Sequence, residues 1–287
     1  MTVRTLTVLL LATALGSGCS RAISFENATP KAPERVEGRL VKPGGAGPFP
    51  ALVLLHGCHG VSPQVHAWAR WLADRGYVAF VVDSFGPRKE PADCKDDPKD
   101  RKAGVPSTAR FDDAIGALRY LQAQPFVVPE RVGSFGWSQG GLYAMSVING
   151  PTLDRARARG VALPRVGYAA AIAMYPGGCR DYATQLVVRP LLLLLGGADD
   201  WTPPQYCREM AANMKARGAD LTLVEYPGVY HYFDVVGQRK EVLKEIEQPF
   251  TPGTFGVTVA YDAEAAADAQ RQVEAFLARV LKGSPPR

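Results

Sequence analysis

The amino-acid sequence predicts one α/β domain built on a mostly parallel, doubly wound sheet with helices on both faces. The first observation is that short apolar runs alternate with segments of helical length from residue 35 onward, an alternation that is typical of parallel sheets. The second is size: a chain of 287 residues, 47% of them hydrophobic, is enough for one well-buried core. The sequence contains no internal repeat.

The predicted strands and helices follow one another along the chain. Residues 35–41 alternate apolar and polar side chains like an edge strand, and the other strands are continuous apolar runs of the kind that a parallel sheet buries on both faces. These runs cover residues 51–56, 77–83, 131–136, 168–176, 190–197 and 221–227. The predicted helices cover residues 63–76, 107–124, 138–149, 202–218 and 263–281. Such a sheet places its chemistry at the carboxyl ends of the strands.

The N-terminus has the features of an export signal. Arg4 supplies a positive charge, residues 6–15 form a short apolar run, and small residues follow at 16–19. This run is too short to span a bilayer, and its flanking residues match a signal peptide. We therefore expect residues 1–18 to be removed from the mature protein.

Cys19 has two interpretations. The stretch LGSGC resembles the cleavage box of a bacterial lipoprotein, in which the cysteine is acylated and tethers the protein to a membrane surface. Plain secretion is the alternative. Either way, we expect residues 19–34 to form a tether, residues 35–287 to form the domain, and the protein to lie in the bacterial cell envelope or outside the cell.

The four remaining cysteines are expected to form disulfides. Cys58, Cys94, Cys179 and Cys207 are an even number of cysteines in an oxidising compartment. Three pairings are possible, and we favour Cys58–Cys94 with Cys179–Cys207 because each pair falls in loops at the same edge of the predicted sheet. No Cys-x-x-Cys spacing is present, which disfavours a metal site.

The stretch GWSQG places Ser138 between Gly136 and Gly140, after a predicted strand and at the start of a predicted helix. This is the context of a nucleophile elbow, a tight turn that exposes a serine hydroxyl. The glycines are needed where a Cβ would clash within the turn. The N–H group of Gln139 lies at the start of the helix, where it can face a developing oxyanion.

A base and an acid follow the serine in the order that such a nucleophile requires. His231 is the only histidine after Ser138, and it follows the last predicted strand of the sheet. Asp199 and Asp200 both follow the preceding strand, and the spacing to nearby glycine and proline residues fits either one. We favour Asp199 as the acid and expect Asp200 to cap the next helix.

The loop after the strand at 51–56 is expected to supply a second oxyanion donor, the N–H group of Cys58. His56 is expected to shape this loop by a structural hydrogen bond. A disulfide from Cys58 to Cys94 would clamp the loop to the long, charged segment at 84–104. Trp137 and Trp201 adjoin the serine and the two aspartates and are candidate substrate contacts.

Five motifs together resemble the dienelactone hydrolase family, which has the α/β-hydrolase fold. They are LLHGCHGV, VVDSFGPR, VGSFGWSQGG, LLLLLGGADDWTPP and YPGVYHYFD, and the resemblance covers residues 35–281. It implies a triad of Ser138, Asp199 and His231. The namesake enzymes have a cysteine at the position of Ser138 and a glutamate at that of Gly57. The family also uses an arginine near Arg88 to hold a substrate carboxylate, which makes Arg88 a candidate substrate contact.

These observations predict an exported serine hydrolase that cleaves a small-molecule carboxylic ester through an acyl-enzyme, without a metal or organic cofactor. The departures from the namesake enzymes favour a general esterase over a lactonase. A peptidase, amidase or thioesterase with the same triad is one alternative, and a catalytically silent envelope lipoprotein is another. The net charge of +5 is mild, and no dense basic cluster is interleaved with aromatics, which disfavours nucleic acid as a partner. Specificity is expected to lie in the loops at 84–104, 150–165 and 235–257.

Overall fold

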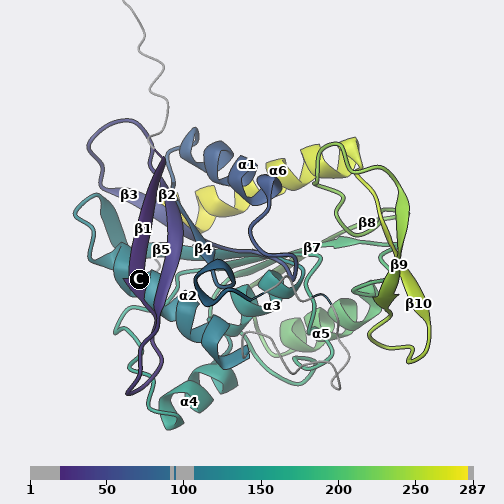
Figure 1. Ribbon diagram of the computed structural model, residues 1–287, viewed down its shortest axis with the longest axis horizontal. Helices are drawn as coiled ribbons and strands as arrows, with labels where there is room; N and C mark the ends of the chain where they lie inside the picture. The colour runs from purple at the N-terminus through teal and green to yellow at the C-terminus, as the bar shows by residue number, and fades with distance from the viewer. Residues whose placement is uncertain (1–19, 91–93, 95–106, 284–287) are drawn as a thin grey trace, which may run out of the picture.

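The computed structural model describes residues 20–90, 94 and 107–283. Eight strands form its central sheet in the order β1-β2-β4-β3-β5-β6-β7-β8 (Figure 1). Their bounds are β1 Ser20–Glu26, β2 Arg35–Val41, β3 Phe49–Leu55, β4 Val78–Asp83, β5 Val127–Trp137, β6 Ala171–Met174, β7 Leu191–Gly196 and β8 Leu221–Tyr226. In this order, neighbouring strands from β4 to β8 pair in parallel. At one edge, β2 pairs antiparallel with both β4 and β1. The predicted mostly parallel sheet is confirmed.

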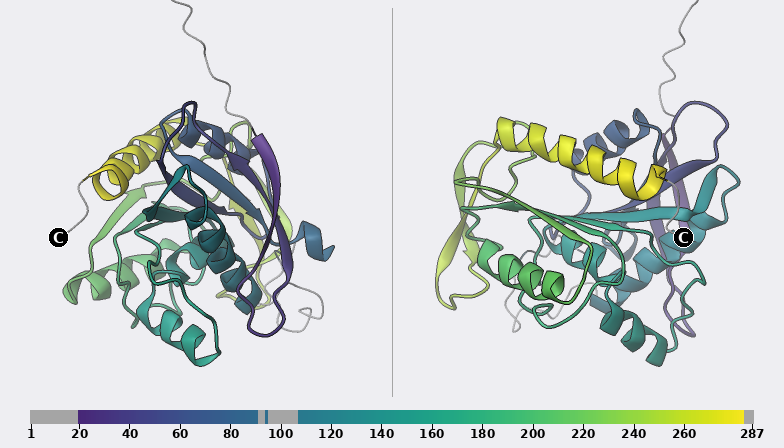
Figure 2. Two further views of the ribbon diagram at one scale, coloured as in Figure 1. Left: turned by 90° about the vertical axis from the view of Figure 1, so that its left-hand side faces the viewer. Right: turned by 180° about the vertical axis from the view of Figure 1, so that it is seen from behind.

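Helices cover both faces of the sheet, as Figure 2 shows. The helices are α1 Pro63–Ala73, α2 Ser107–Gln122, α3 Gln139–Ser146, α4 Gly150–Ala158, α5 Pro204–Ala216 and α6 Ala263–Leu277. Alternate residues of β3 point to opposite faces, as the strand geometry requires. Ala51, Val53 and Leu55 pack in a core with α2, α3 and α5, whereas Leu52 and Leu54 pack in a second core with α1 and α6. No helix in the described ranges is long and apolar enough to cross a membrane.

The first strand differs from the sequence-based prediction. Residues 20–26 were expected to belong to a tether, but they form β1 and pair with β2 over the whole length of both strands. Phe25 is buried, and its ring contacts the ring of Phe80 on β4 with the centroids 5.3 Å apart. Burial of this aromatic side chain explains why the segment joins the sheet. Cys19 and the predicted signal segment at 1–18 lie outside the described residues.

Two of the predicted loops contain regular structure. Helix α4 lies within residues 150–165, and a hairpin of β9 (Glu241–Glu247) and β10 (Phe255–Val259) lies mostly within residues 235–257. The hairpin stands at the right-hand end of the molecule in Figure 1. Ile246, Val257 and Val259 are its buried apolar side chains, and they pack in a small core with Trp201 and the Cys58–Cys94 pair. The alternation within each short strand is incomplete, which explains why periodicity does not reveal the hairpin.

Candidate active site

A strained turn between β5 and α3 presents Ser138. Its backbone angles are φ 51° and ψ −119°, a combination that residues other than glycine rarely adopt. A Cβ on Gly136 would lie 2.0 Å from the Gly140 carbonyl oxygen, and one on Gly140 would lie 1.9 Å from the Leu55 carbonyl oxygen. Both positions therefore require glycine, Gly136 for the turn to close on the start of α3 and Gly140 for the turn to pack against β3. Strained non-glycine residues of this kind cluster at functional sites.

His231 and Asp199 form a buried hydrogen-bonded pair. His231 follows β8 and Asp199 follows β7, and His231 Nδ1 lies 2.6 Å from Asp199 Oδ2. The backbone N–H groups of Trp201 and Thr202 donate to Asp199 Oδ1 at 2.9 and 2.8 Å, and the Thr202 hydroxyl donates to Oδ2. These donors hold the carboxylate in one orientation. The carboxylate in turn favours the imidazole tautomer that carries its proton on Nδ1.

The other ring nitrogen of His231 is available as a proton acceptor. Nε2 is buried and has no hydrogen-bond partner among the residues that the structure describes. A buried polar atom without a partner is destabilising, and each such atom in a native structure requires an explanation. Because Nδ1 carries the proton toward Asp199, Nε2 has a free lone pair. It can accept a proton from a substrate or from a neighbouring nucleophile.

The loop after β6 lies between the serine turn and the histidine. The Ser138 N–H group donates to the Met174 carbonyl at 3.0 Å, and the Gly177 N–H group donates to the Ser138 carbonyl at 3.1 Å. On the other side of this loop, the ring centroids of Tyr175 and His231 are 4.4 Å apart. The serine turn and the histidine loop therefore contact the same short segment at the carboxyl ends of β5 to β8.

The loop after β3 passes beside the serine. A Cβ on Gly57 would lie 3.5 Å from the Trp137 carbonyl oxygen and 3.6 Å from Ser138 Cβ. Cys58 follows Gly57 in this loop, and Gln139 is the first residue of α3. The N–H group of a first helical residue has no partner within its helix. Two backbone segments that flank Ser138 thus carry the proposed oxyanion donors.

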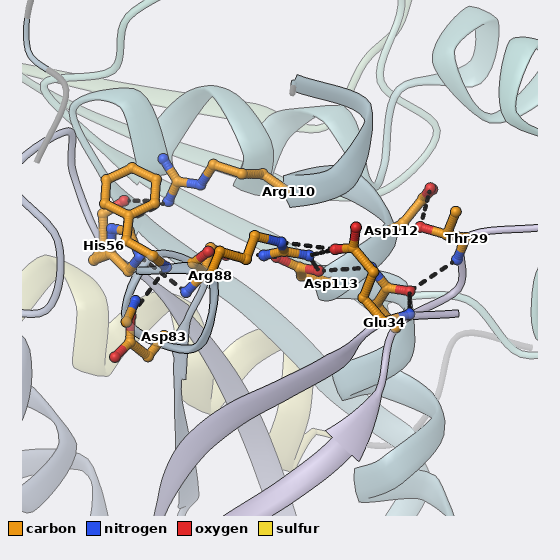
Figure 3. Close-up of polar contacts among 12 residues, drawn as sticks. Thr29, Glu34, His56, Asp83, Arg88, Arg110, Asp112 and Asp113 are labelled. Carbon is orange, nitrogen blue, oxygen red and sulfur yellow. Dashed lines mark hydrogen bonds and ion pairs between the residues drawn. The ribbon is translucent and has the colours of Figure 1, made fainter. Parts of the chain in front are cut away.

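Arg110 on α2 connects these two segments, as Figure 3 shows in part. Its guanidinium donates to the His56 carbonyl at 2.6 Å and to the side-chain oxygen of Gln139. His56 bonds the Gly57 carbonyl through Nδ1 at 2.6 Å and accepts from the Ser84 N–H group through Nε2. Burial, aided by the charge of Arg110, holds the pKa of His56 well below its usual value, so the ring is neutral.

The sequence does not distinguish Arg110 from a surface arginine, because nothing in its helix shows which face lies under the serine turn. Its guanidinium is fully buried and lies near the rings of Phe85 and Tyr143, at 5.1 and 4.6 Å from their centroids. Contacts of this kind are tertiary and leave no local pattern. The structural role of His56 is the one that the sequence suggests.

Arg88 has an intramolecular role that its place in the sequence does not show (Figure 3). Two of its nitrogens donate to the two carboxylate oxygens of buried Asp113 at 2.8 Å. The guanidinium also donates to the Ser84 carbonyl at 2.7 Å and to the carboxylate of Glu34. All three nitrogens are therefore engaged within the protein. This geometry does not favour Arg88 as the group that holds a substrate carboxylate.

The two candidate tryptophans lie in different places. The Trp137 side chain is buried with α1 and α6, and its indole N–H group donates to Asp234 at 2.9 Å, so it is turned into the core. Trp201 is also buried, and its ring centroid lies 4.9 Å from that of His231. Of the two, only Trp201 adjoins the histidine.

Asp200 anchors the β9–β10 hairpin. Its carboxylate accepts hydrogen bonds from the N–H group and the hydroxyl of Thr258 at 2.7 and 2.8 Å. Helix α5 has Pro203 at its N-cap position and no capping side chain, so the expected helix cap at Asp200 is not formed. The adjacent aspartates therefore point to different partners, with Asp199 toward His231 and Asp200 toward β10.

Two disulfides connect loops near the site. Cys58 is joined to Cys94 and Cys179 to Cys207, which is the favoured pairing. The Cys58–Cys94 bridge packs with Trp201 beneath the hairpin. His59 lies near this bridge, and the three potential metal-ligating atoms of Cys58, His59 and Cys94 are within 4.8 Å of one another. Because both sulfurs are used in the disulfide, they are not the thiolates that zinc sites require.

Comparisons with known proteins agree with this fold. A model of the dienelactone hydrolase family matches residues 36–281. One curated relative, named "Probable 2-oxo-3-(5-oxofuran-2-ylidene)propanoate lactonase" from Bradyrhizobium sp, is 27% identical over 199 residues, which cover 68% of this chain and 77% of the relative.

Two solved structures have the same fold. Thermogutta terrifontis esterase 2 phosphorylated by paraoxon has a TM-score of 0.62 and 18% identity, with 92% of this chain and 96% of that one covered. A dienelactone hydrolase-like promiscuous phosphotriesterase from metagenomic libraries has a TM-score of 0.61 and 19% identity, with 92% and 99% covered.

Proposed function

Because the chain belongs to the dienelactone hydrolase family, we propose that it is a serine hydrolase that cleaves small-molecule carboxylic esters through an acyl-enzyme. The observation that carries the proposal is the buried pair of His231 and Asp199, with a free Nε2 atom, at the strand edge where the strained turn presents Ser138. A silent ligand-binding protein has no need of an unpartnered buried imidazole nitrogen or of a strained serine.

In the proposed mechanism, each group of the site has a defined role. The Ser138 hydroxyl oxygen attacks the ester carbonyl carbon while His231 Nε2 takes its proton. Asp199 keeps the ring oriented and stabilises the imidazolium. The N–H groups of Cys58 and Gln139 donate to the oxyanion, and in related sites each such donor contributes about 3 kcal/mol. His231 then protonates the leaving alcohol, and water attacks the acyl-enzyme by the same route.

The surroundings of the serine favour a neutral ester over a carboxylate-bearing lactone. Arg88 is occupied by Asp113 and Glu34, and Gly57 stands where the namesake enzymes have a glutamate. Trp201 and Tyr232 instead place aromatic rings beside His231, with centroids 4.9 Å away in both cases. Aromatic walls of this kind suit apolar acyl or alcohol groups.

Export to an oxidising compartment remains part of the proposal. Two disulfides lie within the described residues, and disulfides are stable mainly outside the cytosol. We propose that residues 1–18 are cleaved as a signal and that Cys19 is the acylation site of a lipid-anchored form. The mass of the mature N-terminal peptide from native cells distinguishes acylated from plainly secreted protein.

Substrate preference tests the proposed function. We expect the purified domain to hydrolyse p-nitrophenyl esters with kcat/KM values far above those for the matching p-nitroanilides and thioesters, over a series from acetyl to octanoyl. A phenolate leaves readily, whereas an anilide nitrogen must be protonated before its C–N bond can break. A higher kcat/KM for the anilides or thioesters would reassign the enzyme to the amidases or thioesterases, and no turnover of any member would contradict catalysis.

A further inference from the structure

A second buried carboxylate lies behind the proposed site, and the mechanism described above does not use it. Asp234 Oδ2 accepts hydrogen bonds from the indole N–H groups of Trp137 and Trp68 at 2.9 and 2.8 Å and from Gln64 Nε2 at 2.5 Å. The Tyr175 hydroxyl donates to Oδ1 at 2.6 Å. Four donors from three separate segments of the chain thus converge on one carboxyl group.

The donor set fits the ionised form of Asp234. Indole N–H groups can only donate, and three N–H groups on Oδ2 leave that oxygen no place for a proton. Gln64 also donates to the Tyr175 hydroxyl at 2.8 Å, which orients the phenol proton toward Oδ1. Burial raises the pKa of Asp234, and the hydrogen bonds from its donors oppose that rise. No ion pair with Asp234 is found within the described part of the chain.

The partners of Asp234 are the supports of the catalytic groups. Trp137 immediately precedes Ser138, so its indole fixes the start of the serine turn. The ring of Tyr175 packs on His231 at 4.4 Å between centroids. Asp234 itself is three residues beyond His231, in the same loop. The Asp234 carboxylate therefore connects the segment that carries Ser138 to the segment that carries His231.

Helix α1 adds a third connection. Gln64 and Trp68 lie on α1 (Pro63–Ala73), the helix that follows the loop carrying Cys58. The position of the Cys58 loop is thus coupled, through α1, to the same carboxylate. Burying a charge is costly unless it is fully hydrogen-bonded, and a core that needed only packing would be served by an apolar side chain of similar size. The retained charge indicates a use beyond stability.

We propose that Asp234 is a positioning residue of the active site, which holds the Ser138 turn and the His231 loop together and supplies a buried negative charge behind His231. This inference rests on the proposed triad. The charge stabilises the imidazolium that forms when Ser138 transfers its proton, in addition to the direct contact from Asp199.

The other titratable groups around His231 do not duplicate this charge. Burial raises the pKa values of Tyr175 and Tyr232, so both phenols stay neutral at neutral pH. Burial, together with His231, lowers the pKa of His59, and Glu245 acts on His59 in the opposite direction. Asp199 bonds the imidazole directly, and Asp234 bonds the hydroxyl of Tyr175, whose ring packs on the imidazole.

Asp234→Asn tests the proposal, because the amide keeps the shape and removes the charge. We expect kcat/KM for p-nitrophenyl acetate to fall about 10- to 100-fold, the scale of a displaced catalytic group. We also expect the acidic limb of the pH dependence of kcat/KM to move to lower pH by about 0.5–1 pH unit. The sign follows because loss of a nearby negative charge destabilises the positively charged form of the base.

Tyr175→Phe is the matched control. It keeps the carboxylate charge and the ring that packs on His231, and it removes only the hydroxyl that donates to Oδ1. We expect it to lower kcat less than Asp234→Asn does and to leave the acidic limb in place. If Asp234 had only a structural role, the acidic limb would stay in place in Asp234→Asn as well.

The outcomes separate this proposal from the proposed function. In one outcome, wild-type protein hydrolyses esters while Asp234→Asn has a kcat/KM within about twofold of the wild-type value and an unchanged acidic limb of its pH profile. That result would overturn the role of Asp234 and leave the triad standing. If wild-type protein hydrolyses no ester, the proposed function fails first. If circular dichroism shows that Asp234→Asn does not fold, Trp137→Phe and Tyr175→Phe test the proposal instead. Each is expected to lower kcat at unchanged KM. A wild-type kcat in both variants would overturn the proposal.

Discussion

Ser138→Ala is expected to reduce the hydrolysis of p-nitrophenyl acetate by about 10⁶-fold in kcat, the loss that follows removal of a serine nucleophile in a triad. Without the hydroxyl, His231 has no nucleophile to deprotonate, and only substrate binding and the oxyanion donors remain. The fold should survive, since alanine meets the same backbone strain at φ 51° that serine does. Thermal unfolding followed by circular dichroism should give a Tm close to that of the wild type.

Ser134→Ala is a suitable control for this experiment. Ser134 is also buried on β5, and its hydroxyl donates to the Ala144 carbonyl at 3.0 Å. Loss of this bond should cost about 1 kcal/mol of stability and leave most of the activity. If Ser138→Ala retained turnover comparable with that of Ser134→Ala, the nucleophile would have to be another residue.

Asp199→Asn is expected to lower kcat by about 10⁴-fold with little change in stability. An asparagine amide would donate to His231 Nδ1, which favours the tautomer with its proton on Nε2 and removes the free proton acceptor at that atom. Asp200→Asn should instead lower kcat by about tenfold at most, because Asp200 holds Thr258 and not the histidine. Steady-state kinetics on the two variants provide the comparison.

The two adjacent aspartates make this pair of variants informative. The glycine and proline spacing fits both residues, whereas the hydrogen bond at 2.6 Å involves Asp199. A larger loss for Asp200→Asn than for Asp199→Asn would reverse the assignment of the acid and would contradict the geometry of the loop after β7.

Much of the fold can be predicted from local patterns in this sequence. The apolar runs at β3 and β7 are continuous because a parallel sheet buries both of their faces, and both were predicted within two residues of their bounds. The serine turn is local in part: a Cβ at Gly136 would clash with Gly140 in the same motif, whereas a Cβ at Gly140 would clash with Leu55 on the neighbouring strand β3. The order of serine, aspartate and histidine then selected His231 and the adjacent pair of Asp199 and Asp200, and the hydrogen bond at 2.6 Å distinguishes Asp199.

The features that the sequence did not reveal depend on distant contacts. Strand β1 is recognisable only once its partner β2 and the ring of Phe80 are in place. The motif around Arg88 is typical of a substrate-binding arginine, and only the fold shows that Arg88 forms an ion pair with Asp113 on α2. Asp234 follows the histidine in a short motif, yet its donors come from residues 59 to 170 positions away. Such partnerships follow from the packing of the sheet and not from spacing along the chain.

The most direct test of the account is the site of covalent modification by a fluorophosphonate. Wild-type protein should gain the mass of one adduct, and peptide mapping should place it on Ser138, because the hydroxyl activated by His231 is the group that attacks the phosphorus. Ser138→Ala should gain none, and Asp199→Asn should react far more slowly. An ester-hydrolysing wild-type protein that stayed unmodified, or that carried the adduct on another residue, would contradict the assignment of Ser138 as the nucleophile.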